Sequence, residues 1–232
     1  MQDDERQNTA LPTRGLIGGS PSMRAHRRRV LPVEHPLFLS PLDDDDHARQ
    51  LVEFMSSSQP VAVEIGFGKG LFLVSFAAAH PDWRFIGLEV KSQLCRIALS
   101  RLDKQSLANA RVILADARYL LPRFVPGATI DALFILFPDP WWKKRHHKRR
   151  ILDTVTLAPL LPLLKDGALL TVRSDVPAVL DLASEVIAEL GCFQVITDPG
   201  MELPRTDRER RYDGTGVPHE QMCFRYQCRG SL

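Results

Sequence analysis

Short runs of apolar residues alternate with helix-length segments along most of this chain, starting at Val61. The run VAVEI (61–65) is followed by a glycine turn and by LFLVSFAAA (71–79), which is typical of a strand, a turn and a helix. Similar runs predict further strands at 84–90, 111–115, 130–137 and 168–173, and further helices at 91–106, 151–164 and 177–190. Continuous apolar strands between helices indicate a parallel sheet that is covered on both faces.

The pattern changes towards the end of the chain. The runs CFQVIT (192–197) and MCFRYQC (222–228) both predict strands, but no helix-length apolar period separates them. We therefore expect an antiparallel pair at one edge of the sheet. The predicted fold is α/β and Rossmann-like, with a mostly parallel seven-stranded sheet, an antiparallel edge pair and helices on both faces. The connection at 198–221 is long and rich in Arg, Asp, Gly and Pro, which is typical of a functional segment.

The first 35 or so residues differ from the rest of the chain. They carry Arg24 and Arg27 to Arg29 among Pro, Gly and Ser, with no sustained apolar period to bury. The sequence therefore predicts a flexible basic arm at 1–35 and one folded domain at 36–232. The formal net charge is only +2, but the positive charge is concentrated at 24–29, 143–150 and 205–211. Such clusters favour a polyanionic partner.

Several classes of protein are disfavoured by what the chain lacks. Its four cysteines, Cys95, Cys192, Cys223 and Cys228, form no C-x-x-C pair, and no His cluster stands beside them at metal-ligand spacing. The longest apolar runs fall well short of the roughly 20 residues that span a bilayer, and the N-terminus is too polar for a secretory signal. We expect a cytoplasmic protein with reduced thiols, no metal and no membrane association.

Four acidic residues stand at the carboxyl ends of successive predicted strands: Glu64, Glu89, Asp116 and Asp139. Ligands of open α/β sheets bind at these strand ends, where the strand order reverses. The glycine turn at 66–70 follows Glu64 directly but lacks the full G-x-G-x-x-G spacing, so it decides little alone. Glu89 stands about as far past the turn as the ribose-binding acid of a Rossmann unit. An adenosine ligand is therefore predicted.

Glu64 indicates which adenosine ligand to expect. A carboxylate at the entrance of the turn would repel a pyrophosphate, but it suits a ligand that carries an ammonium and a sulfonium. S-adenosylmethionine therefore fits better than a dinucleotide. Asp116 can accept a hydrogen bond from the adenine amino group. The alternative is that these acids are helix N-caps, a common position for Asp after a strand.

The segment FPDPWWKKRHHKRR (137–150) has the composition of a nucleic-acid site. Asp139 lies between two prolines, which fix φ and favour an extended backbone, so its carboxylate is held by a stiff chain. Trp141 and Trp142 offer flat faces for a nucleobase, and the basic run from Lys143 suits phosphates. Taken alone, the basic run could instead be a nuclear localisation signal or the solvated start of a helix.

With its motifs EIGFGKG (64–70), GLEV (87–90), FPDPWWKKRHHKRR and Thr-x-x-Glu (206–209), the chain resembles the bacterial tRNA (guanine-N7)-methyltransferases over about 61–226. The resemblance implies a class I methyltransferase fold. It also implies transfer of a methyl group from S-adenosylmethionine to N7 of a guanine in the variable loop of tRNA. The partners would be tRNA and S-adenosylmethionine, and the protein a monomer or homodimer.

The resemblance also implies a role for individual residues. Cofactor contacts would come from the glycine turn and the strand-end acids: Glu64, Gly66, Gly68, Glu89, Asp116 and Asp139. Asp139 would also be the catalytic residue. The substrate would contact Lys143, Asp175, Thr206, Asp207, Arg208 and Glu209. The chain departs from the family at Arg208, where an aromatic residue is more common, and at Trp142, where proline or a small polar residue is more common.

Guanine N7 carries an exposed lone pair, so we expect Asp139 to orient the base rather than to remove a proton, with Asp175 and Glu209 reading the guanine N–H edge. Two alternatives stay open. Asp-Pro-Trp also resembles the element that grips a base amine in exocyclic-amine methyltransferases, which would act on another RNA. The second alternative is an RNA-binding protein without catalysis.

Overall fold

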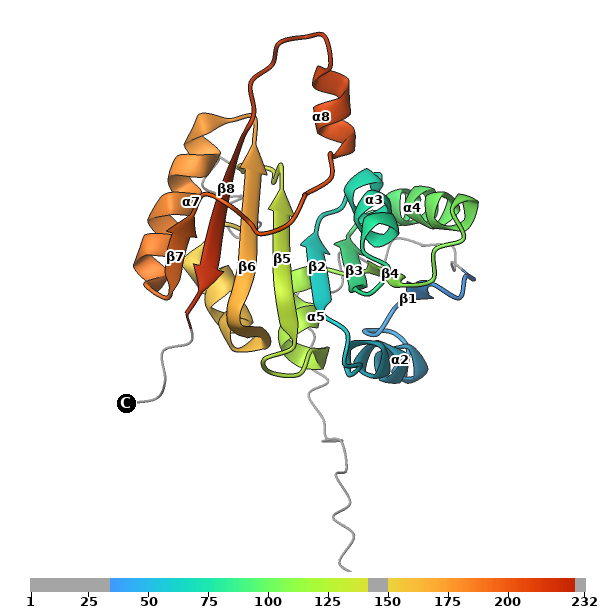
Figure 1. Ribbon diagram of the computed structural model, residues 1–232. Helices are drawn as coiled ribbons and strands as arrows, with labels where there is room; N and C mark the ends of the chain where they lie inside the picture. Colours follow the sequence, from blue (N-terminus) through green and yellow to red (C-terminus); the bar gives the residue numbers. More distant parts are fainter. Residues whose placement is uncertain (1–33, 142–149, 228–232) are drawn as a thin grey trace, which may run out of the picture. The chain divides into compact units, whose positions relative to one another are not determined.

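The computed structural model describes residues 34–141 and 150–227 of the 232-residue chain. In this part of the chain, eight strands form one sheet in the order β1-β4-β3-β2-β5-β6-β8-β7 (Figure 1). The strands are β1 (Phe38–Leu39), β2 (Val61–Ile65), β3 (Arg84–Glu89), β4 (Ala110–Leu114), β5 (Ile130–Leu136), β6 (Leu164–Ser174), β7 (Phe193–Ile196) and β8 (Glu220–Tyr226). Strand order reverses between β2 and β5, which lie side by side, so a ligand site is expected at their carboxyl ends.

The sheet confirms the predicted fold class and corrects the number of strands. The strands from β1 to β6 pair in parallel, whereas β8 pairs antiparallel with both β6 and β7. The eighth strand is β1, which pairs with β4 through only two residues, Phe38 and Leu39. A strand this short has too few positions to show an alternating or continuous apolar pattern, so the sequence did not reveal it.

The helices that flank the sheet are α2 (Asp45–Met55), α3 (Leu71–Ala79), α4 (Ser92–Lys104), α5 (Ala117–Phe124), α6 (Thr154–Leu157), the 3₁₀ helix η2 (Ala158–Leu163), α7 (Pro177–Leu190) and α8 (Asp207–Tyr212). The predicted helix at 151–164 was wrong in form. It is a single α-helical turn followed by a 3₁₀ helix that contains Pro162. Proline has no N–H and clashes with the preceding helical turn, which explains why the α-helix does not continue.

Two apolar clusters lie on opposite faces of the sheet. One joins α3 and α4 to the sheet through Phe72, Phe76, Phe85 and Phe134, and the rings of Phe72 and Phe134 lie 4.9 Å apart. The other joins α2, α5, η2 and α7 to the opposite face. Successive residues of β2 alternate between the two clusters, as the side-chain period of a strand requires. The sheet is therefore covered on both faces, and its carboxyl edge is left for a site.

Helix α8 stands beyond the carboxyl ends of β2, β5 and β6 (Figure 1). It belongs to the long connection between β7 and β8, for which the sequence predicted a functional role without predicting a helix. None of the helices in the described ranges is long and apolar enough to cross a membrane. Within the same ranges, no three His, Cys, Asp or Glu residues are grouped so that they could hold a metal ion.

Candidate cofactor and nucleic-acid site

The glycine turn after β2 has a backbone that glycine alone adopts readily. Gly66 and Gly68 have φ of +78° and +58°, in the left-handed region. The Gly66 N–H donates to the Leu88 carbonyl over 2.8 Å, which fastens the turn to the end of β3. A Cβ added at either glycine would meet no other atom within 4 Å. The backbone therefore faces open space at the sheet's carboxyl edge, where a ligand can approach it closely.

Glu64 is the buried acid of this edge. It is 2% exposed, and its Oε2 has no hydrogen-bond partner among the described residues. Burial, and then the negative charge of Glu89, raises the pKa of Glu64 to about 8. An unpartnered buried carboxylate costs free energy unless a cation or donor satisfies it. Glu64 therefore fits the ammonium group of a bound amino-acid moiety.

Glu89 is fixed by the backbone around it. Its Oε1 accepts hydrogen bonds from the N–H groups of Val90 (2.8 Å) and Lys91 (3.1 Å), and its Oε2 accepts one from Gly68 (3.2 Å). Burial raises the pKa of Glu89 in spite of these hydrogen bonds. The contact with Gly68 confirms that the ribose-type acid and the glycine turn lie together. This pair matches the place that the sequence predicts for a ribose.

Asp116 caps α5, as the alternative interpretation of the strand-end acids proposed. Its Oδ1 accepts hydrogen bonds from the backbone N–H (3.1 Å) and the Nε–H (2.9 Å) of Arg118, and its Oδ2 accepts one from the same guanidinium. Capping and ligand binding are compatible, because a carboxylate has about four lone-pair sites. The contact of Asp116 with adenine stays a prediction.

Asp139 is exposed and lies on a short, constrained segment after β5. Two non-glycine residues in this segment have positive φ, namely Phe137 at +52° and Trp141 at +45°. Such conformations cost free energy and are found mainly at functional sites. The Phe137 N–H donates to the Arg173 carbonyl (2.8 Å), and Arg150 Nε donates to the Pro140 carbonyl (3.1 Å). Asp139 is thus held on a backbone that is anchored on both sides.

Thr206 and Glu209 form a capping box at the start of α8. The Thr206 Oγ1 accepts from the Glu209 N–H over 3.2 Å, and the Thr206 N–H donates to Glu209 Oε2 over 2.6 Å. Both residues are buried. The Thr-x-x-Glu element therefore has a structural reason for its spacing, since the two side chains satisfy the first turn of this short helix.

Asp207 joins α8 to the half of the sheet that carries the glycine turn. It accepts a hydrogen bond from the N–H of Leu71, the first residue of α3, over 3.1 Å. It also accepts two from Arg101 of α4, over 2.8 and 2.9 Å. Burial raises the pKa of Asp207, but these hydrogen bonds and the Arg101 charge outweigh it, so the net shift is downward. Asp207 is therefore ionised and anchors α8.

Arg173 of β6 is a site residue that sequence reasoning missed. It is 6% exposed, and its Nη1 lies 3.3 Å from both carboxylate oxygens of Glu209. It also donates to the carbonyls of Pro204 (2.6 Å) and Leu203 (3.3 Å), which hold the chain that leads to α8. Its positive charge favours the ionised form of Glu64. The only available signal was a single charged residue that ends an otherwise apolar strand pattern.

Asp175, directly after β6, is bound by two side chains of α8. Arg208 Nη2 donates to its Oδ2 over 2.9 Å, and the Tyr212 hydroxyl donates to the same oxygen. Burial alone would raise the pKa of Asp175. The hydrogen bonds from these donors and the charge of Arg208 have the larger effect, so the pKa lies below its usual value. The structure thus brings Asp175 together with the 206–209 element, whereas Lys143 and Trp142 lie outside the described residues.

Comparison with known proteins decides the family. The sequence family described as "Putative methyltransferase" matches residues 58–215. A tRNA (guanine-N(7)-)-methyltransferase of Pseudomonas fluorescens is 33% identical over 219 residues, which cover 92% of this chain and 89% of that protein. One from Rhodopirellula baltica is 31% identical over 186 residues, covering 73% of this chain and 67% of that protein.

The chain belongs to the tRNA (guanine-N7)-methyltransferase family. Solved structures show the same fold at low sequence identity. The aminoglycoside resistance methyltransferase NpmB1 aligns with a TM-score of 0.55 at 17% identity, over 77% of this chain and 93% of that one. A 16S rRNA adenine methyltransferase from Catenulisporales acidiphilia, solved with its cosubstrate S-adenosylmethionine, aligns with a TM-score of 0.54 at 14% identity, over 80% of this chain and 93% of that one. The predicted Rossmann-like methyltransferase fold is therefore confirmed.

Membership of the family also agrees with the geometry of the sheet. Its carboxyl edge holds a buried acid with an unpartnered oxygen at Glu64, an open glycine backbone at Gly66 and Gly68, and an anchored acid at Glu89. These groups fit the amino-acid tail and the ribose of S-adenosylmethionine, which is the methyl donor of this family. The sequence places each of them at or just after a strand end, and their contacts with the ligand stay a prediction.

Proposed function

We propose that this protein transfers a methyl group from S-adenosylmethionine to N7 of a guanine in the variable loop of tRNA. The observation that carries the proposal is the buried, unpartnered Oε2 of Glu64 beside the open glycine turn. A cationic ligand would satisfy this carboxylate, whereas the pyrophosphate of a dinucleotide would be repelled by it. Family membership supplies the acceptor, because the relatives are named as tRNA (guanine-N(7)-)-methyltransferases.

In this proposal, Glu64, Gly66, Gly68, Glu89 and Asp116 hold the methyl donor. Glu64 binds its ammonium, and Glu89 binds the ribose hydroxyls. Asp116 keeps its capping hydrogen bonds, and a remaining lone pair of its carboxylate accepts a hydrogen bond from the adenine amino group. The donor supplies an electrophilic methyl group on a positively charged sulfur.

Asp139 orients the acceptor in the proposed reaction. Guanine N7 attacks with its own lone pair, so the N7–methyl bond forms as the sulfur–methyl bond breaks, and no proton has to leave. The positive charge passes from sulfur to the base, where a nearby carboxylate stabilises it. Holding the two reacting atoms in line can supply about 7–11 kcal/mol in well-oriented systems. The constrained backbone around Asp139 supports this role.

Asp175 is the residue we propose to read the guanine. Its lowered pKa keeps it ionised, and an ionised carboxylate accepts from the N1–H and amino group that distinguish guanine from adenine. Glu209 was predicted to share this task. Because its oxygens are used in the capping box and with Arg173, we propose that it acts mainly by holding Thr206 and Asp207 in position.

The RNA backbone would be bound by the basic run that begins at Lys143 and by exposed arginines of α8, Arg210 and Arg211. Arg208 lies on the same helix. A tRNA substrate would place the enzyme in the cytoplasm. The expected oligomeric state, monomer or homodimer, stays a prediction.

The proposal is tested by incubating the purified protein with radiolabelled S-adenosylmethionine and unmodified tRNA. Label should enter the tRNA, and Asp139→Ala should abolish transfer while most tRNA binding remains. Asp82→Ala, an exposed acid at the opposite edge of the sheet, serves as the matched control and should transfer normally. Equal activity of Asp139→Ala and Asp82→Ala would reject the role of Asp139.

The two alternative functions give different results in the same assay. A methyl group on an exocyclic amine would leave the RNA uncleaved by borohydride and aniline, whereas N7-methylguanine makes it cleavable. An RNA-binding protein without catalysis would show neither label transfer nor a calorimetric response to S-adenosylmethionine.

A further inference from the structure

Arg208 lies in an environment that resembles a nucleobase site. Its Nη2 donates to Asp175 Oδ2 over 2.9 Å, and its Nε donates to the Tyr212 hydroxyl over 2.8 Å. Its guanidinium carbon lies 5.6 Å from the centre of the Phe137 ring. A carboxylate thus receives the edge of a flat cationic group while an aromatic ring lies against its face.

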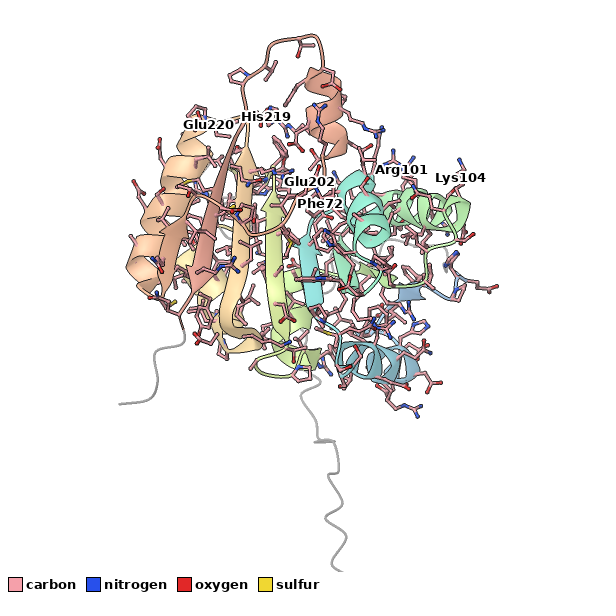
Figure 2. The ribbon with its side chains drawn as sticks, in the orientation of Figure 1. Phe72, Arg101, Lys104, Glu202, His219 and Glu220 are labelled. Atoms are coloured by element: carbon pink, nitrogen blue, oxygen red, sulfur yellow. The ribbon has the colours of Figure 1, made fainter. Side chains whose placement is uncertain are left out.

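A third aromatic ring lies near the two, Phe137 and Tyr212, that contact this guanidinium. The ring of His219 lies 6.2 Å from the ring of Phe137 and 6.2 Å from that of Tyr212, measured between ring centres. His219 lies between α8 and the start of β8 (Figure 2). Phe137 is also the first residue of the segment that carries Asp139. The guanidinium of Arg208 is therefore close to the proposed catalytic segment.

The chemistry of guanine explains why this arrangement matters. In guanine, N1, C2 and the exocyclic amine form a planar guanidine unit that presents parallel N–H donors. The arginine guanidinium is planar and presents N–H donors in the same fork geometry. A carboxylate and an aromatic face that suit one group also suit the other.

We propose that Arg208 occupies the guanine site of the RNA-free enzyme as a mimic of the target base, which must displace it from Asp175. This inference rests on the proposed function, because it takes Asp175 to be the acceptor for the guanine. It gives Arg208 a role different from stacking, which is the role that an aromatic residue at this position would have.

The structure allows the exchange to take place through one side chain. The neighbours of Arg208 are fixed, since Asp207 is bound to Arg101 and Glu209 to Arg173. The Arg208 side chain itself is 38% exposed, whereas that of Asp175 is 13% exposed. Arg208 can therefore swing into solvent while α8 keeps its place and Tyr212 continues to hold Asp175.

Self-occupancy raises the affinity that any base needs to enter the site, and Asp175 selects guanine among the bases. A base displaces Arg208 only when it offers Asp175 donors that replace those of the guanidinium. Adenine presents an acceptor at N1, and a carboxylate facing that acceptor would lose a donor without gaining one. An ion pair this exposed is worth up to about 1 kcal/mol, which corresponds to about a fivefold weaker binding of every competing base.

The first test measures binding of guanosine 5′-monophosphate and adenosine 5′-monophosphate by calorimetry to the full-length protein. Arg208→Ala should bind the guanine nucleotide about fivefold more tightly than the unsubstituted protein, and the adenine nucleotide should stay the weaker ligand of both proteins. Arg49→Ala removes the arginine of an exposed Arg–Asp pair in α2, to which no role in binding is assigned, and is the matched control. It should show no gain for either nucleotide.

The second test uses methylguanidinium at low millimolar concentration as a free copy of the Arg208 head group. It should inhibit methyl transfer by Arg208→Ala competitively with tRNA and leave the unsubstituted enzyme unaffected. Arg208→Lys keeps the charge without the planar fork, so its affinity for the guanine nucleotide should lie between those of the other two. Thermal unfolding checks that each variant is folded.

Weaker or unchanged guanine-nucleotide binding by Arg208→Ala would overturn the proposal, and Arg208 would then be a direct substrate contact or a structural residue. If neither nucleotide binds measurably to any variant, the test rests on the tRNA kinetics. The proposal would then be overturned if Arg208→Ala had the same KM for tRNA as the unsubstituted protein and if methylguanidinium did not inhibit it. Failure of the proposed function looks different. In that case the unsubstituted protein would transfer no methyl group to guanine N7, whatever Arg208→Ala does to nucleotide affinity.

Discussion

The guanidinium of Arg101 makes two hydrogen bonds, of 2.8 and 2.9 Å, to the carboxylate of Asp207. This pair fastens α8 to α4, and the hydrogen bond from the Leu71 N–H to Asp207 fastens it to the start of α3. Through Arg173 and Asp175, the same helix is fastened to β6. Helix α8 therefore bridges the two halves of the sheet across the point where the strand order reverses, and it links the glycine turn to the proposed base site.

Loss of the Arg101–Asp207 pair should impair catalysis more than folding. Arg101→Ala should lower kcat/KM for tRNA by about tenfold, because charge-assisted hydrogen bonds of this kind are worth about 1.5–3 kcal/mol. Lys104→Ala, on the exposed side of the last turn of α4, is the matched control (Figure 2). Steady-state kinetics give kcat/KM for tRNA in both variants. Parallel losses in Arg101→Ala and Lys104→Ala would refute a specific role of the pair.

Arg173 and Glu209 are expected to act mainly on stability. Their side chains are 7% and 6% exposed, so removal of the arginine leaves a buried carboxylate without its main counter-charge. Arg173→Leu should lower the free energy of unfolding by about 3–5 kcal/mol. Adding Glu209→Gln removes that charge while keeping an acceptor for the Thr206 N–H, so the double variant should recover part of the loss. Urea unfolding measures the free energy of unfolding of both variants. If the double variant were no more stable than Arg173→Leu, the unpaired charge of Glu209 would not be the cause of the loss.

Binding of S-adenosylmethionine should depend on pH through Glu64. With its pKa raised to about 8, Glu64 is mostly protonated at neutral pH in the free protein, whereas the ammonium of the ligand favours the carboxylate. Affinity should rise by up to about tenfold per pH unit below 8, with release of a proton on binding, and should fall again where the ligand's own ammonium loses its proton. Calorimetry in buffers of different ionisation enthalpy detects that proton.

The same raised pKa has a consequence for the stability of the free protein. Between pH 4.5 and 8, the folded state holds a proton on Glu64 that the unfolded state has lost, so this contribution to stability falls as pH rises. Glu64→Gln should remove the dependence in this range and should prevent ligand binding. A Glu64→Gln variant that binds S-adenosylmethionine normally would contradict the role of Glu64.

The glycine turn offers a comparison between strain and ligand contact. Gly68 and Gly167 both have positive φ, and an added Cβ would meet nothing within 4 Å at either. Alanine at each position should therefore cost a similar amount of stability, about 1–2 kcal/mol. Only Gly68→Ala should also weaken S-adenosylmethionine binding, because Gly167 lies at the start of β6, away from the carboxyl edge. Equal affinities in the two variants would show that the turn does not approach the ligand.

The sequence was informative wherever a residue's place follows from strand topology. Glu64 and Glu89 lie together because parallel strands end at the same edge, so the cofactor side of the site could be predicted. Arg173 could not, because its partners come from 203–209 and from Gln221 of β8, which reach it only through the tertiary fold. Likewise, the position of Arg208 against Phe137 depends on the packing of α8 over the sheet, which no local pattern specifies.

The central claim is that the acceptor atom is guanine N7 in tRNA. It is tested most directly by treating unmodified tRNA with the enzyme and S-adenosylmethionine, then with borohydride and aniline, and mapping the cleavage. We predict one enzyme-dependent cleavage at a guanine of the variable loop. Methyl transfer without cleavage, or cleavage outside that loop, would contradict it.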